Sequence, residues 1–179
     1  MLDYYQNFLS PQESAQLMNW LDASEEVNWQ SETFRIYGRE VTAPRTLTWF
    51  GDAGLNYRYT GCDHFTHGWP EPLQRIRQKV HALSGLTFNF VLLNRYQNGA
   101  QYMGWHKDDE RGAAATIASL SLGASRRFRV DSNTSGERET LQLEDGSLLV
   151  FDGRQRHCLP ATKRCDLPRI NLTFRRIQA

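Results

Sequence analysis

Two stretches in the first half of the chain carry apolar residues at helical spacing. Ser10–Glu13 has the pattern of a capping box, with serine at the N-cap, proline at the first helical position and glutamate three residues after the cap. Leu17, Trp20 and Leu21 supply the apolar face behind it. In Glu71–Ser84 apolar residues recur every three or four positions, and a glycine follows as the stop. The pattern predicts one helix in each stretch.

Beyond the second predicted helix the pattern changes to short β-rich runs separated by Gly, Asn and Asp turns. These runs are Thr87–Tyr96, Thr116–Leu122, Arg127–Val130, Glu139–Leu143, Ser147–Phe151 and Arg169–Ile177. Short strands with regular turns are typical of a sandwich or barrel. Because helices come first and strands follow, we expect an α+β protein with a jelly-roll (double-stranded β-helix) core and N-terminal helices packed on it.

Composition narrows the class of protein. The 179 residues suit one domain, with helices in residues 1–86 and the jelly-roll core in residues 87–179. Apolar residues make up 40% of the chain and charged residues 23%, which disfavours disorder and coiled coils. No run approaches the roughly 18 apolar residues that a membrane span needs. The first residues also lack the pattern of a signal peptide. We therefore expect no membrane segment, a monomer, and a cytoplasmic location, nucleoid-associated or nuclear if the source is eukaryotic.

The formal charge of +1 hides an uneven distribution. The first 30 residues contain five acidic residues and no Lys or Arg, so the rest of the chain is basic. Part of that charge falls on a basic strand with Arg126, Arg127 and Arg129, whose alternation also fits a solvent-exposed face. This balance permits a polyanionic partner without requiring one.

The cysteines do not suggest a disulfide framework. There are three, Cys62, Cys158 and Cys165, and none is in a CxxC spacing. An odd count without that spacing speaks against both paired disulfides and a thiolate zinc site. We expect them to be reduced and structural.

The segment Trp105–Glu110 is rich in groups that bind metals. In an extended chain side chains alternate, so His106 and Asp108 would point the same way. His157, which follows the apolar run Leu148–Phe151, can add a third ligand if the two strands are neighbours. Two imidazoles and one carboxylate form the facial triad of non-haem Fe(II) oxygenases, with coordination positions left open. On the HxD tripeptide alone, a surface turn with an ordinary histidine is an equally good interpretation.

The C-terminal run Arg169–Arg175 alternates strictly between polar and apolar residues. Its polar face would carry Arg169, Asn171, Thr173 and Arg175. A solvated edge strand is one interpretation. The other is a cleft that binds carboxylates, because guanidinium groups match them in a bidentate fork. Asn94 and Tyr96 interrupt an otherwise apolar strand, where polar groups need partners, and they too are predicted to line a pocket. A dicarboxylate cosubstrate beside iron would fit such a cleft.

Taken together, four separated motifs are similar to those of a known family. They are Asn94–Tyr96, His106–Glu110, His157–Pro160 and Arg169–Arg175, with Pro44–Arg45 and Gly51–Leu55 upstream. The chain resembles the AlkB family of Fe(II)- and 2-oxoglutarate-dependent dioxygenases over residues 31–177, and looks closest to the branch that repairs alkylated DNA. One departure is that Gln155 and Arg156 precede His157, where family members commonly carry aromatic residues, and the connection there is shorter.

The resemblance implies roles for the residues already singled out. The triad of His106, Asp108 and His157 would hold Fe(II), and Arg169, helped by Asn94 and Tyr96, would clamp the far carboxylate of 2-oxoglutarate. Arg175 and Asn171 would support the metal end, with Arg175 part of the catalytic group. The implied reaction uses O2 to dealkylate bases such as N1-methyladenine and N3-methylcytosine in DNA, and it releases formaldehyde, succinate and CO2.

The resemblance also implies a substrate side. A base must be flipped out of a duplex to be oxidised, and Tyr57 or Tyr59 would lie against it in a nucleotide lid. Packing within a sheet is the alternative for both tyrosines. If the strand continues beyond Asp108, alternation places Glu110 on the same face as His106 and Asp108, where its carboxylate can accept a hydrogen bond from the exocyclic amine of a cationic methylated base. The alternative for Glu110 is a solvated acidic turn.

The segment Phe34–Arg39 is predicted to be a hairpin. Its tip would carry Ile36 and Tyr37 between Arg35 and Arg39. An aromatic wedge can fill the gap left by an extruded base, and the flanking cations can hold phosphates. A hairpin packed on the core is the alternative.

Two other functions are compatible with these residues. One keeps iron and 2-oxoglutarate but acts on RNA, a protein or a small molecule. The other is a metal-binding jelly-roll module without catalysis, in which Arg169 and Arg175 would have no carboxylate to hold.

Overall fold

The computed structural model describes residues 2–59, 61–132 and 136–178, except for the side chains of Phe34 and Ile36. Its elements, in chain order, are β1 (Leu2–Tyr5), α1 (Pro11–Ala23), β2 (Gln30–Ile36), β3 (Arg39–Gly51), β4 (Asn56–Tyr59), β5 (Cys62–Phe65), α2 (Glu71–Ser84), β6 (Phe90–Tyr96), β7 (Met103–His106), β8 (Thr116–Gly123), β9 (Arg126–Asp131), β10 (Arg138–Leu143), β11 (Leu148–Asp152), β12 (His157–Leu159) and β13 (Arg169–Arg175).

Two antiparallel sheets form the jelly roll. The larger has the order β1-β11-β8-β13-β6-β3-β2, and the smaller has the order β10-β9-β12-β7. The hairpin β4-β5 forms a small sheet of its own. An apolar cluster between the two larger sheets, which includes Ile117, Phe128, Val130 and Phe151, holds them together. The predicted jelly-roll fold is confirmed.

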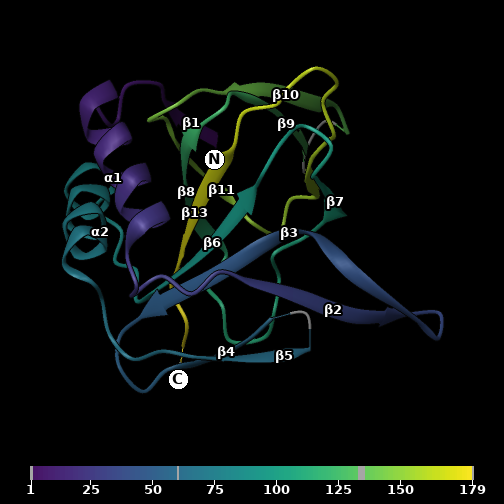
Figure 1. Ribbon diagram of the computed structural model, residues 1–179, viewed down its shortest axis with the longest axis horizontal. Helices are drawn as coiled ribbons and strands as arrows, with labels where there is room; N and C mark the ends of the chain where they lie inside the picture. Colours follow the sequence, from purple (N-terminus) through teal and green to yellow (C-terminus); the bar gives the residue numbers. More distant parts are fainter. Residues whose placement is uncertain (1, 60, 133–135, 179) are drawn as a thin grey trace.

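Both helices lie on one face of the larger sheet (Figure 1). Leu17 and Leu21 of α1 and Leu73 of α2 belong to one buried cluster with sheet residues such as Leu120 and Leu172. Burial of such side chains contributes roughly 1.5–3 kcal/mol each. The helices therefore complete the core on the side of the sheet away from the smaller sheet.

The predicted start of α1 and both predicted bounds of α2 are confirmed. At the start of α1, the Ser10 side chain accepts a hydrogen bond from the Glu13 backbone N–H at 3.1 Å, and the Glu13 carboxylate accepts one from the Ser10 N–H at 2.8 Å. At the end of α2, Gly85 adopts φ +70°, a left-handed conformation that other residues rarely adopt.

The six predicted strands are all present. The expectation that the helices come first and the strands follow is wrong for the first half of the chain. Five strands precede α2, and β1, β2 and β3 pair within the same sheet as β6, β8, β11 and β13. The division at residue 86 therefore does not separate the strands of the jelly roll from the rest. The strands β1, β7 and β12 have only three or four residues, too few for a period of two to stand out.

The three cysteines, Cys62, Cys158 and Cys165, are free thiols, as expected. Cys158 is buried in β12, whereas Cys62 is exposed. Within the described residues, neither helix has the length and apolar character to cross a membrane.

Candidate metal centre and cosubstrate pocket

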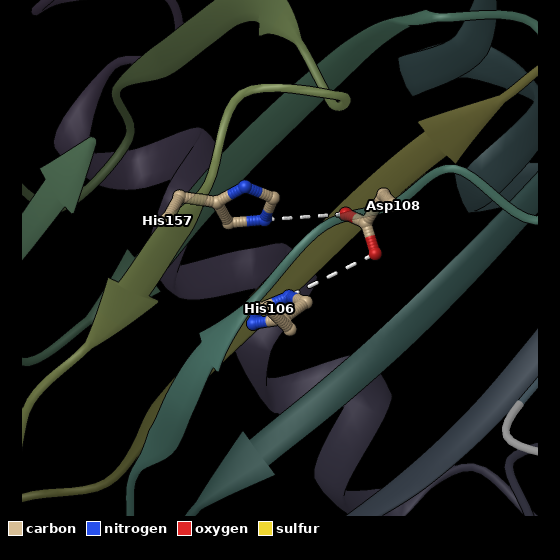
Figure 2. Close-up of side chains that lie close together, drawn as sticks. All are labelled: His106, Asp108 and His157. Atoms are coloured by element: carbon tan, nitrogen blue, oxygen red, sulfur yellow. Dashed lines mark ion pairs between the residues drawn. The ribbon is translucent and has the colours of Figure 1, made fainter. Parts of the chain in front are cut away.

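Neighbouring strands of the smaller sheet bring two histidines together. His106 is the last residue of β7, His157 is the first residue of β12, and the two are directly paired across the sheet. Figure 2 shows Asp108 beside both rings. Its Oδ1 lies 3.7 Å from His106 Nε2, and its Oδ2 lies 3.4 Å from His157 Nε2. One ligand atom from each residue lies within 4.8 Å of the others, a spacing that suits a single metal ion.

The backbone sets the tautomer of both histidines. His106 Nδ1 lies 2.7 Å from the Gly104 carbonyl, and His157 Nδ1 lies 2.7 Å from the Gln155 carbonyl. Because a carbonyl only accepts hydrogen bonds, both Nδ1 atoms carry a proton. Both Nε2 atoms then keep a lone pair for a metal, the arrangement found in protein metal sites.

The aspartate is suited to complete the triad. Asp108 is buried, and its Oδ1 has no hydrogen-bond partner among the described residues. Burial raises the pKa of this carboxyl, but the positive charge of the nearby Arg175 and the contact with His157 outweigh it, so the pKa lies well below its ordinary value. Burial lowers the pKa of His106 despite the opposing charge of Asp108. An ionised carboxylate and a neutral imidazole are the forms that bind Fe(II).

The route by which Asp108 reaches the site differs from the prediction. The strand ends at His106 instead of continuing to Glu110. Asp108 is instead fixed by a hydrogen bond from its backbone N–H to the Gly153 carbonyl, at 2.8 Å. A Cβ on Gly153 would lie 2.4 Å from Ile117 Cδ1 and 3.1 Å from Asp108 Cβ. Gly153 is thus a supporting residue that the sequence did not single out.

A narrow pocket with a cavity volume of about 50 Å³ lies between the two sheets, lined by the three metal ligands and by Arg169. The Arg169 side chain is fully buried, and it donates one hydrogen bond, from Nη2 to Ser121 Oγ at 3.0 Å. Its Nε and Nη1 have no partner within the described residues. Burial lowers the pKa of Arg169 to about 10, which still leaves it charged at neutral pH. A buried cation of this kind needs an anion, so the site fits the carboxylate of 2-oxoglutarate.

Other polar side chains of the pocket have protein partners. Asn171 donates to Ser119 Oγ at 2.6 Å and accepts from Thr173 Oγ1 at 2.8 Å. Asn94 accepts a hydrogen bond from Nε of the buried Arg45 at 2.9 Å. Tyr96, directly opposite Arg169 on the next strand, also lines the pocket. The structure thus brings together the residues predicted to hold the cosubstrate, and their individual roles stay predictions.

The sequence profile described as the 2OG-Fe(II) oxygenase superfamily matches residues 1–175. The chain belongs to this superfamily. It is 41% identical to the DNA oxidative demethylase ALKBH2 of Mus musculus over 157 residues, which cover 80% of this chain and 66% of that protein. It is 40% identical to the Homo sapiens ALKBH2, over a match that covers 80% of this chain and 60% of that protein. It is 29% identical to the human alpha-ketoglutarate-dependent dioxygenase alkB homolog 3, across 97% of this chain and 65% of that protein.

These relatives confirm the resemblance to the AlkB family and its DNA repair branch. The chain spans about 56–66% of the length of the ALKBH2 proteins that it matches. A solved structure, that of OsALKBH1, covers 98% of this chain and 97% of its own, with a TM-score of 0.68 and 17% identity. That likeness shows that the fold is shared.

In this AlkB-family oxygenase, Arg175 links the metal centre to the predicted substrate side. Its Nη2 lies 3.0 Å from Asp108 Oδ2, and its Nη1 lies 3.9 Å from Glu110 Oε2 and 3.3 Å from the Tyr57 hydroxyl. Tyr57 in turn donates to Glu110 at 2.9 Å. Burial lowers the pKa of Arg175, but Asp108 and the tyrosines outweigh it and raise the pKa above its ordinary value. Glu110 therefore reaches the site although its strand ends early.

The two lid tyrosines are both buried. They pack in a cluster with Leu47, Phe90 and other apolar residues, as the sheet-packing alternative describes. Tyr59 also lines the pocket. Its stacking against a base stays a prediction.

The predicted hairpin is present, formed by β2 and β3. Its turn is Tyr37-Gly38, with φ of +49° and +78°, the type I′ geometry of a two-residue hairpin. Tyr37 is fully exposed, at 102% of its reference area, so the core-packing alternative is wrong for this residue. Arg35 and Arg39 are exposed as well. The Ile36 side chain lies outside the described residues.

Arg126 is a correction to the idea of a continuous basic strand. It is buried and donates to the carbonyls of Gln101 at 2.8 Å and Pro160 at 2.9 Å. Arg127 is exposed. Arg126 thus connects two loops and is not available to bind a ligand at the protein surface. Alternation along one strand could not reveal these contacts, because they come from other parts of the chain.

Proposed function

We propose that this protein removes small alkyl groups from the nitrogen atoms of nucleobases in DNA, such as N1-methyladenine and N3-methylcytosine. The reaction would consume 2-oxoglutarate and O2 and release succinate, CO2, formaldehyde and the repaired base. The observation that carries the proposal is the pairing of the His106, Asp108 and His157 triad with Arg169 in one buried pocket. The DNA oxidative demethylase relatives support the choice of substrate.

The residues of the pocket suit this chemistry. His106, Asp108 and His157 would hold Fe(II), and Arg169 would hold the far carboxylate of 2-oxoglutarate. When bound, this pair supplies the oxidation of the N-methyl carbon, with O2 as the oxidant. Arg175 holds the Asp108 carboxylate in place through a 3.0 Å contact, so it orients a ligand instead of reacting itself. The methyl carbon leaves as formaldehyde once it is hydroxylated.

The substrate side supports a nucleobase. Glu110 contacts Arg175 and Tyr57, and Arg175 in turn contacts the metal ligand Asp108. A carboxylate at this position can accept a hydrogen bond from an exocyclic amine and attract a cationic base. Burial raises the pKa of Glu110, with Arg175 opposing the shift. The exposed Tyr37 between two arginines suits insertion into a stack whose base has been extruded.

RNA is the main alternative substrate, since a flipped base presents the same edges in either nucleic acid. A protein or small molecule would use neither Tyr37 nor its flanking arginines. The non-catalytic alternative leaves the buried Arg169 without an anion, which is costly.

A substrate panel tests the proposal. The protein is incubated aerobically with Fe(II), 2-oxoglutarate and matched DNA and RNA oligonucleotides that carry N1-methyladenine or N3-methylcytosine, and the bases are analysed by mass spectrometry. We expect loss of 14 mass units, one CH2, from the DNA bases. Asp108→Ala is the control for contaminating activity. Conversion of RNA alone would replace DNA as the substrate, and no conversion of either would reject the proposal.

A further inference from the structure

One buried histidine lies outside the metal centre. His64 of β5 is fully buried, and its ring joins two other elements. Its Nδ1 lies 3.0 Å from the Tyr57 carbonyl on β4, and its Nε2 lies 2.7 Å from Glu32 Oε1 on β2. The ring also meets the Trp49 ring of β3 edge to face, at 4.4 Å between centroids. His64 therefore contacts β4, whose Tyr59 lines the pocket, and the first strand of the hairpin at once.

The bonding of this ring is fixed by simple hydrogen-bond chemistry. The Tyr57 carbonyl can only accept, so Nδ1 carries a proton. At Nε2 the pair shares one proton, as imidazolium with carboxylate or as imidazole with carboxylic acid. In both forms the bond from Glu32 to His64 is made, and the Glu32 side chain is only 11% exposed. A short pair with so little water around it is a strong local connection.

Glu32 lies at the point where the regular pairing of β2 with β3 is interrupted. The register of β2 against β3 breaks between Ser31 and Thr33, and on the opposite strand Pro44 offers no backbone N–H. Regular pairing resumes from Thr33 with Thr42 out to the turn. We call residues 33–42 the arm; Figure 1 shows it extending away from the rest of the molecule.

The arm needs support at its base. Most of its residues are exposed, and its strands pair with each other at the end of the seven-stranded sheet. A two-stranded hairpin of this size is at best marginally stable in water. A break in the ladder at Glu32 is a natural point for the arm to pivot, and the bond to His64 acts at that point.

We propose that Glu32 and His64 are positioning residues that hold the arm at a fixed angle to β4, whose Tyr59 lines the pocket. The Tyr57 carbonyl, Tyr59 and Tyr37 then keep a constant spatial relation. A nucleic acid bound by the arm would thus have its flipped base aligned with the entrance of the pocket. This inference rests on the proposed function for its catalytic consequence, but the mechanical link can be tested on the protein alone.

Three variants isolate the link. Glu32→Ala removes the bond to His64. Glu32→Gln keeps a neutral one, because its amide can donate to Nε2 while Nδ1 still donates to Tyr57. Glu40→Ala is the matched control, since Glu40 is an exposed glutamate of the same hairpin opposite Arg35.

Amide hydrogen exchange tests the link without any substrate. In Glu32→Ala we expect exchange in residues 33–42 to rise about tenfold while α2 keeps its protection. Glu32→Gln and Glu40→Ala should stay within about threefold of the parent protein. Unchanged exchange in the arm of Glu32→Ala would overturn the proposal. An equal rise in α2 would do the same, because it would mean general destabilisation instead of a local link.

Kinetics test the consequence. For Glu32→Ala we expect the KM for a methylated duplex to rise about tenfold with kcat within about twofold, and turnover of a methylated trinucleotide too short to span the arm to be unchanged. Glu32→Gln should restore the duplex KM. An equal loss on both substrates would overturn the positioning role. If the parent protein converts no nucleic acid, the proposed function fails, and the exchange experiment alone decides whether the link exists.

Discussion

The pocket and the arm are built in opposite ways. In the pocket, Asp108, Arg169 and Arg175 are buried, and protein atoms or a predicted ligand fix their charged groups. In the arm, the tip residue Tyr37 is fully exposed on a two-residue turn. Oxidation chemistry needs groups held in place before the substrate arrives. Recognition of a stacked nucleic acid needs a projecting side chain that meets its partner only on binding. The contrast predicts that changes in the pocket affect every substrate, whereas changes in the arm discriminate between substrates.

The largest effect is expected at the metal ligands. Replacement of His106, Asp108 or His157 by Ala should abolish succinate production, because each removes one of three protein ligands. Folding should survive, as followed by circular dichroism. Near-normal succinate production by any of the three variants with iron still bound would show that the triad is wrongly assigned.

A substitution behind the metal centre should give the next largest effect. In Gly153→Ala the added Cβ would lie 2.4 Å from Ile117 Cδ1, which must move, and 3.1 Å from both Cβ and the carbonyl oxygen of Asp108, which must give slightly. We expect a cost of about 1–3 kcal/mol in unfolding free energy and weaker Fe(II) binding. Chemical denaturation and metal titration measure the two effects. Fe(II) affinity equal to that of the parent would remove Gly153 from the support of Asp108.

A smaller, selective effect is expected at the cosubstrate. Arg169→Lys should raise the half-saturating 2-oxoglutarate concentration about tenfold, because an ammonium cannot reproduce the planar fork. Titration of 2-oxoglutarate against succinate production decides this. If half-saturation does not change, the clamp lies at another residue.

The smallest effect on overall activity, and the most selective, is expected at the arm. Tyr37→Ala should lower repair of a duplex lesion about tenfold and leave repair in a single strand nearly unchanged, because a single strand has little stacking to break. The melting temperature should barely move, since Tyr37 is exposed. Tyr102→Ala, at another exposed tyrosine, is the control. Equal losses on both substrates would contradict the wedge.

The sequence predicts the residues that would bind the metal and the cosubstrate better than it predicts the residues that hold them in place. Alternation predicts that His106 and Asp108 lie on one face, although Asp108 lies beyond the end of β7, and a strict period of two marks Arg169 within β13. Gly153 and the link from Glu32 to His64 join segments far apart in the chain, so no local pattern marks them.

The same reason explains the gaps in the predicted fold. The helices have caps that can be read within a few residues. The long strand β3 carries Pro44 at its irregular point and exposed residues in the arm, which hides its alternation. The monomeric state stays a prediction, to be tested by the mass in solution.

The most direct test of the central claim is the stoichiometry of one reaction on a methylated duplex. Formaldehyde, succinate and repaired base are measured together for the parent protein and for Tyr37→Ala. The account predicts one formaldehyde for each repaired base in both, with succinate at least equal to the repaired base. It also predicts that Tyr37→Ala repairs less duplex but forms succinate at the parent rate when no nucleic acid is present. Succinate without formaldehyde or repaired base on every methylated nucleic acid would contradict it.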